Sequence, residues 1–190
     1  MWETLDTTPG QEVAKRAIEV ALAGLHSLTC VGREWADIMA AHARRLGVEA
    51  RAVKPCPCGN LGTPTAECTC TPAEVRRWRR NRLYTVPRGA DLVVEVHEPP
   101  ARACVSYRGE LETDMLARAL AVRAAPPIPL RVDCGDGVRL LELACQKIGN
   151  LTARVPQIIA VAATIAQLDH DKTIQVRHVA EAIAYRGPRE

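Results

Sequence analysis

Phenylalanine is absent from the sequence, and aromatic residues make up only 3% of it. A core without them has to consist of Ala, Val, Leu and Ile in closely packed helices, and aromatic platforms that stack on nucleobases are disfavoured. No stretch approaches the roughly 20 uncharged apolar residues of a membrane span. The start of the chain also lacks the apolar region of a secretion signal. We therefore expect a cytoplasmic protein that does not contact a membrane.

The length and the hydrophobic content of the sequence indicate a folded chain. Its 190 residues, 47% of them hydrophobic, are enough for one domain or for a compact domain with a small lid. The formal net charge of +3 permits contact with nucleic acid without requiring it. Eight cysteines in a cytoplasmic chain are not expected to form a disulfide framework.

Short apolar runs alternate with helical patterns in the first two thirds of the chain. Runs at residues 27–31, 50–53 and 91–96 predict strands, and the helical pattern between the first two indicates a βαβ unit. The fold class is therefore α/β, with a core at residues 1–125 that includes an irregular cysteine-rich loop at 55–72. Further helices are expected at residues 34–46, 73–83 and 111–124.

The first helix is expected between Thr8 and His26. Thr8 is its predicted cap, and Gln11 is placed to reach back to that cap. The helical spacing leaves Arg16 and Glu19 on the solvent side.

Only helical patterns follow the breaker run Pro126-Pro127-Ile128-Pro129. Three helices are expected, at about residues 137–148, 153–168 and 175–185, with apolar stripes that face a common interior. This change of pattern predicts a helical lid domain at residues 130–190.

Three distinctive stretches occur in a fixed order. They are GQEVAKRAIEVALAGLHSL at 10–28, PCPCG and CTCTPAEV within 55–75, and TARVPQIIAVAATIAQL and TIQVRHVAEAIAYR within 152–186. Together they resemble the ComM branch of the magnesium-chelatase-like (ChlI-type) AAA+ ATPases. The resemblance implies a reduced AAA+ core, in which strands 2 and 3 of the family are missing. A three-stranded parallel sheet of order 5-1-4 and a three-helix lid would remain.

The phosphate-binding loop of that family is not recognisable here. An active member needs a glycine-rich loop with Gly-Lys-Ser/Thr after the first strand, because backbone N–H groups and a lysine neutralise the phosphates. Here no glycine lies between Gly32 and Gly47, and Glu34 and Asp37 would repel phosphate. The segment between the first two strands is also too short to hold a Walker B strand.

Other nucleotide-contacting positions of the family are altered as well. The asparagine expected before PCPCG is Lys54, and the arginine finger falls at Gly89, beside Arg88. Only the lid arginine that looks like a nucleotide sensor is retained, as Arg154. We expect neither ATP binding nor enzymatic activity, and an ATPase with an unusual site is the catalytic alternative.

The paired cysteines form the most specific candidate site. Cys56, Cys58, Cys68 and Cys70 offer four thiolates that could converge tetrahedrally on zinc. A redox-active dithiol and free structural thiols are the alternatives. The remaining cysteines are interpreted as plain buried or half-buried thiols: Cys30, Cys104, Cys134 and Cys145.

A basic helix directly follows the cysteine loop. The helix carries residues that could bind phosphates or an acidic partner: Arg76, Arg77, Trp78, Arg79, Arg80 and Arg82. A solvated helix face with a buried Trp78 is the alternative.

The sequence leaves two competing hypotheses for the function. The first is a non-catalytic remnant that binds or regulates a related AAA+ ring, or self-associates, in DNA processing. The second is a zinc-stabilised module that binds nucleic acid.

Overall fold

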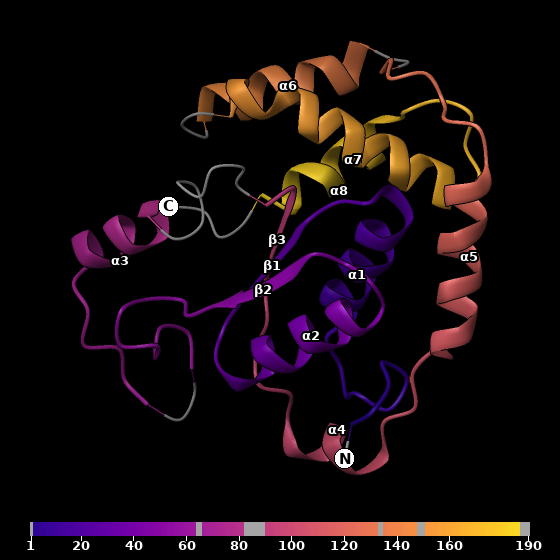
Figure 1. Ribbon diagram of the computed structural model, residues 1–190. Coiled ribbons are helices and arrows are strands. Elements are labelled where there is room, and N and C mark those ends of the chain that lie inside the picture. The colour runs from indigo at the N-terminus through magenta and orange to yellow at the C-terminus, as the bar shows by residue number, and fades with distance from the viewer. Residues whose placement is uncertain (1, 64–65, 82–89, 133–134, 148–150, 187–190) are drawn as a thin grey trace.

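The computed structural model describes residues 2–63, 66–81, 90–132, 135–147 and 151–186 (Figure 1). The predicted α/β class is confirmed. In chain order the elements are α1 (Glu12–Gly24), β1 (Leu28–Val31), α2 (Glu34–Arg45), β2 (Ala50–Val53), α3 (Pro72–Arg79), β3 (Leu92–Glu95), α4 (Ala101–Ser106), α5 (Glu112–Ala124), α6 (Gly135–Lys147), a 3-10 turn (Thr152–Arg154), α7 (Val155–Leu168) and α8 (Val176–Ala184).

The three described strands form one parallel sheet in the order β2-β1-β3. The resemblance predicts this order, because β2, β1 and β3 stand for strands 4, 1 and 5 of the family. Cys30 lies opposite Ala52 on one side and Val94 on the other. Side chains alternate along a strand, so these three residues share one face of the sheet.

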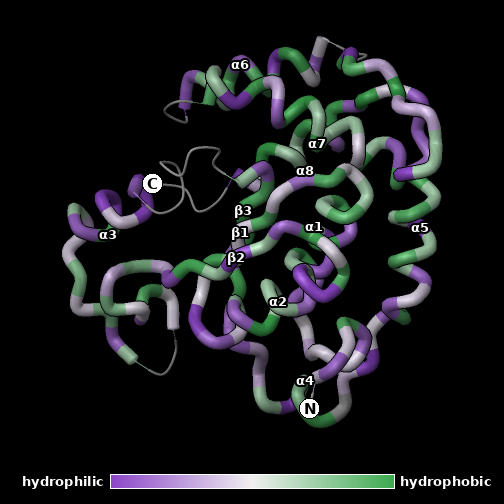
Figure 2. The backbone as a smooth tube through the Cα atoms, in the orientation of Figure 1, coloured by the Kyte–Doolittle hydropathy of each residue, from purple (hydrophilic) through white to green (hydrophobic). Residues whose placement is uncertain are grey.

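Helices α1 and α2 cover that face. Helix α1 contacts β1 and β3, α2 contacts β1 and β2, and the two helices contact each other. Ile18 and Met39 are fully buried between these helices and the sheet, and the small residues Ala17 and Ala40 are buried beside them. Figure 2 shows hydrophobic colours along the strands and along the neighbouring α1. The expected aliphatic core is confirmed.

The start of α1 differs from the prediction. Gly10 and Gln11 both have positive φ, at 63° and 64°, so the chain turns sharply and the helix begins only at Glu12. The Gln11 side chain donates to the carbonyl of His97 instead of reaching Thr8. The Thr8 hydroxyl donates to the carbonyl of Thr4 at 2.9 Å. The predicted capping box is therefore wrong.

The C-terminal helices lie close to the predicted positions. Helix α7 contacts both α1 and α5, and Ile158 and Ile165 of α7 belong to the same buried cluster as Ile18 of α1. The division into a core and a separate lid domain stays a prediction. Helix α4 was not predicted from the sequence. None of the helices in the described part of the chain has the length and apolar character needed to cross a membrane.

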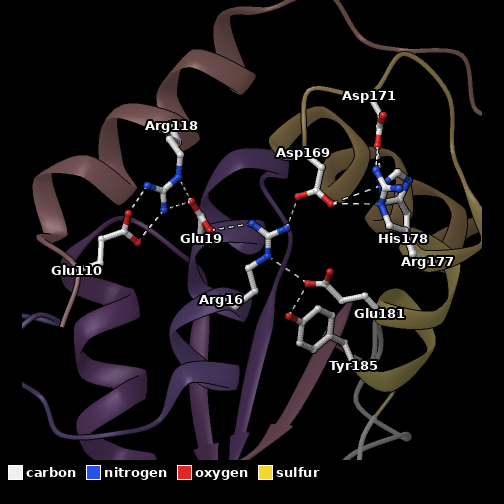
Figure 3. A network of polar contacts seen from close by, with 10 residues as sticks. All are labelled: Arg16, Glu19, Glu110, Arg118, Asp169, Asp171, Arg177, His178, Glu181 and Tyr185. Atoms are coloured by element: carbon white, nitrogen blue, oxygen red, sulfur yellow. Dashed lines mark hydrogen bonds and ion pairs between the residues drawn. The ribbon is translucent and has the colours of Figure 1, made fainter.

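A network of charged side chains fastens α1 to α5 and to the turn after α7 (Figure 3). Arg16 of α1 donates to Glu19 at 3.0 Å, to Asp169 at 2.8 Å and to Glu181 of α8 at 3.2 Å. Arg118 of α5 donates to Glu19 from its Nε atom at 2.8 Å. The Glu19 side chain is only 5% exposed. The expectation that Glu19 faces solvent is therefore wrong, because two arginines neutralise the charge of the buried carboxylate.

Strand β2 is one edge of the sheet, and side chains cap part of that edge. The carbonyls of Glu49 and Val53 accept hydrogen bonds from the N–H groups of Leu28 and Gly32, on the β1 side. The carbonyls of the even-numbered residues of this strand therefore point away from the sheet. Arg44 donates to the Ala50 carbonyl at 3.0 Å, and the Trp78 indole donates to the Lys54 carbonyl at 3.0 Å. Capped carbonyls are poor partners for a further strand.

Candidate metal centre

The cysteine-rich loop after β2 folds through local hydrogen bonds. The Gly59 N–H donates to the Cys56 carbonyl at 3.1 Å, and Gly59 has φ of 84°, a conformation that glycine adopts without strain. The Thr63 hydroxyl donates to the carbonyls of Asn60 and Ala66. These bonds shape a loop that brings the second cysteine pair back to the first.

The four cysteine sulfurs meet at one point. The Sγ atoms of Cys56 and Cys58 are 3.4 Å apart, and both lie 3.7 Å from that of Cys68. All four sulfurs, including that of Cys70, lie within 4.8 Å of one another. Tetrahedral zinc with bonds of about 2.3 Å places its sulfurs about 3.8 Å apart. The observed cluster therefore fits a four-coordinate metal ion.

The surroundings of the cluster shift the cysteine pKa values in opposite directions. Hydrogen bonds from the backbone of Asn60, from Cys56 and from the backbone of Thr69 lower the pKa of Cys58 to about 6. The backbone hydrogen bond from Cys58 favours the Cys70 thiolate, but desolvation and the neighbouring sulfurs outweigh it and raise the pKa of Cys70 to about 12. A metal cation at the centre of the cluster would offset the neighbouring sulfur charges that raise the pKa of Cys70.

Helix α3 begins directly after the cluster and is tied to the chain just after β2. Thr71 and Glu74 form a capping box, in which the Thr71 N–H donates to the Glu74 carboxylate at 2.8 Å. Val75 is buried, and the Trp78 indole holds the helix against the carbonyl of Lys54. The structure thus uses Trp78 as an anchor.

A pocket of about 270 Å³ opens beside the loop at the carboxyl ends of β1 and β3. Open parallel sheets bind ligands at this edge. The pocket is lined by both carboxylates and arginines: Arg33, Glu34, Arg79, Glu95 and Glu98. Arg79 lies 3.5 Å from the Glu95 carboxylate. More carboxylates than guanidinium groups therefore face this pocket.

Two family models match the chain. The model for magnesium chelatase subunit ChlI matches residues 43–103, and the model for the ChlI C-terminal region matches residues 131–186. The chain belongs to the magnesium-chelatase-like family. The first match contains the cysteine cluster, and the second contains α6, α7 and α8. A comparison with curated proteins finds no match.

The retained arginine of this magnesium-chelatase-like protein lies apart from the pocket. Arg154 ends the 3-10 turn and precedes the first residue of α7. Among the described residues that line the pocket, Arg154 is absent. Its role as a vestigial sensor of nucleotide stays a prediction.

The structure separates the arginines of the basic helix. Arg76, Arg77 and Arg80 are exposed, whereas Arg79 turns inward to Glu95 with its side chain 12% exposed. Arg82 lies outside the described residues. The helix pattern alone could not distinguish these arginines, because the inward side is set by a contact with a distant residue, Glu95 of β3.

The scattered cysteines have different surroundings. Cys30 is buried in β1, where burial raises the pKa of its thiol to about 12, and Cys145 is half-buried. Cys104 is exposed, so the expectation of a buried thiol there is wrong; α4, which carries it, lies at the surface. Cys134 lies outside the described residues.

Proposed function

We propose that this magnesium-chelatase-like protein is a non-catalytic binding module whose cysteine cluster holds zinc. In this proposal it joins or blocks an assembly of intact AAA+ relatives and does not hydrolyse ATP. AAA+ subunits present complementary faces to their neighbours, which gives a degenerate subunit a surface to use. A DNA-processing setting follows from the ComM resemblance alone.

The short connection between β1 and α2 carries this proposal. Strand β1 ends at Val31 and α2 begins at Glu34, so only Gly32 and Arg33 lie between them. A phosphate loop needs several backbone N–H groups to surround a phosphate. A two-residue turn does not supply that cradle.

The surroundings of the turn also support the proposal. A Cβ atom at Gly32 would lie 2.4 Å from the Val96 carbonyl, so the turn is packed against the end of β3. The first turn of α2 carries Glu34 and Asp37. Their charges occupy the positive end of the helix dipole, where a phosphate would otherwise bind.

We expect no magnesium-dependent binding of ATP. Calorimetric titration of the purified protein with Mg-ATP and Mg-ADP should give only heat of dilution at millimolar nucleotide, and phosphate release should not exceed that of buffer. An intact family member titrated in parallel is the control. Saturable, magnesium-dependent heat from this protein would refute the proposal.

The exposed arginines of α3 favour a second candidate, binding of nucleic acid. Arg76 and Arg77 are exposed on the helix beside the cysteine cluster. We expect the double change Arg76→Ala and Arg77→Ala to weaken oligonucleotide binding, measured by fluorescence anisotropy over a range of salt. The slope of log affinity against log salt should fall by about 1.8, for two lost phosphate contacts.

Two exposed arginines elsewhere provide the matched control for this test. Arg123 of α5 and Arg139 of α6 are exposed, and their replacement by alanine removes the same charge. If both double variants weaken binding equally, the effect comes from net charge and not from α3. Unchanged affinity in the α3 variant would exclude this candidate.

A further inference from the structure

A second hollow lies beside the pocket described above, between α2, α4 and the N-terminal segment. Its volume is about 390 Å³. It is lined by Trp2, Glu34, Trp35, Ile38, Glu98, Pro99, Ala101 and Cys104. We call it the tryptophan groove. Figure 1 shows α4 and the N-terminus side by side at one end of the molecule, below α2.

Two aromatic rings form part of the wall of the tryptophan groove. The ring centroids of Trp2 and Trp35 are 4.7 Å apart, and the ring planes are tilted by 42°. Both side chains are half-buried. The face of a tryptophan ring attracts cations, and the planar guanidinium of arginine stacks on it particularly well. The pair is unusual in a chain with only 3% aromatic residues.

The charged side chains among the described residues that line the groove are all acidic. Glu34 and Glu98 line it and are exposed, and no arginine, lysine or histidine is among its described lining residues. Within the described part of the chain, neither carboxylate forms an ion pair. Carboxylates bind a guanidinium through two parallel hydrogen bonds, whereas they repel phosphate.

We propose that the tryptophan groove binds an arginine-bearing segment of a partner protein. The guanidinium stacks on the tryptophan pair, and Glu34 and Glu98 neutralise its charge. Ile38 and Pro99 offer apolar surface to the methylene groups of the arginine side chain. This inference rests on the proposed function, because it gives the binding module the chemistry of its partner.

The test uses a short glycine- and serine-flanked peptide with one central arginine. Two further peptides carry citrulline, the neutral analogue of arginine, or lysine at that position. Binding to the full chain is followed by tryptophan fluorescence and calorimetry. We expect the arginine peptide to bind, the citrulline peptide not to bind, and the lysine peptide to bind several times more weakly.

The double variant Glu34→Gln and Glu98→Gln should weaken binding of the arginine peptide at least tenfold, which is a loss of about 1.4 kcal/mol. Both residues are exposed, so the variant should keep the circular dichroism spectrum and thermal stability of the parent. Glu142→Gln changes an exposed carboxylate of α6 outside the groove and should leave the affinity unchanged.

Three outcomes of the peptide experiments would overturn the inference. They are equal binding of the citrulline peptide, equal loss of affinity in the Glu142→Gln variant, and absence of binding at millimolar peptide. Self-association that is abolished by the double variant would place a second copy in the groove and would also overturn it. None of these outcomes bears on nucleotide binding, so the inference can fail while the proposed function stands.

Discussion

Replacing Cys58 and Cys68 with serine should abolish stoichiometric metal binding by this protein. The two sulfurs lie 3.7 Å from each other, and each also lies next to Cys56. Their loss leaves two thiols, which cannot close a tetrahedral zinc site. Elemental analysis should find about one zinc per parent chain and almost none in the variant.

The same variant should unfold the loop without unfolding the core. The main apolar cluster contains α1, the sheet and α7, and neither Cys56 nor Val75 belongs to it. The segment from 55 to 79 therefore depends on the metal for its folding, as small zinc-held units do. Amide hydrogen exchange should rise by orders of magnitude in that segment and stay unchanged in α1 and α7.

A cysteine outside the cluster provides the control. Cys145→Ser changes a half-buried thiol on α6 and should keep both the zinc content and the exchange pattern of the parent. Equal zinc content in the parent and the Cys58→Ser, Cys68→Ser variant would contradict the metal assignment. Zinc loss without faster exchange in the loop would show that the metal does not hold the fold there.

The second large effect should come from Glu19→Gln in the charged network. Glu19 accepts hydrogen bonds from Arg16 and Arg118, and its side chain is 5% exposed. The neutral amide leaves both guanidinium groups without their shared countercharge. Because the two arginines are partly exposed and can recover hydration, we expect a loss of about 2 kcal/mol in the free energy of unfolding. For a chain of this size that lowers Tm by about 4–8 °C.

Glu110→Gln is the matched control for this change. Glu110 also pairs with Arg118, but its side chain is 55% exposed. An exposed pair of this kind contributes about 0–1 kcal/mol. In denaturant titrations, the free energy of unfolding should therefore fall by about 1 kcal/mol or more further in Glu19→Gln than in Glu110→Gln. Equal losses would mean that the burial of Glu19 does not set the strength of the network.

The network also joins parts of the chain that are distant in sequence. Arg16 connects α1 to Asp169 and to Glu181. Faster hydrogen exchange in α8 of the Glu19→Gln variant would show that the network holds the C-terminal helices on the sheet.

Several features followed from local sequence alone. The alternation of apolar runs and helical patterns predicted β1, β2 and β3 with small errors in their bounds, because strand and helix periods are local properties. The two close pairs Cys56, Cys58 and Cys68, Cys70 in a loop rich in glycine and proline predicted a zinc site, with a redox-active dithiol and free thiols as the alternatives, and the structure brings the four thiols together. The absence of Gly-Lys-Ser/Thr after β1 predicted the loss of a phosphate loop.

Other features depended on contacts between distant residues. Helical spacing put Glu19 on the solvent side, but the docking of α5 brought Arg118 onto it and made its burial possible. The run of arginines gave no sign that Arg79 turns to Glu95 while Arg76 stays exposed.

The sequence by itself therefore determined most of the elements, the α/β class and the cysteine cluster, because these are encoded in residues close together along the chain. The parallel order β2-β1-β3 was predicted only through the family resemblance, since β1 and β3 are distant in sequence. Only the tertiary structure decided which charges are buried, where α3 docks, and that Trp2 and Trp35 meet in a groove with Glu34 and Glu98. The physical reason is that burial and charge pairing are set by the partners that packing brings together, and those partners lie tens of residues apart.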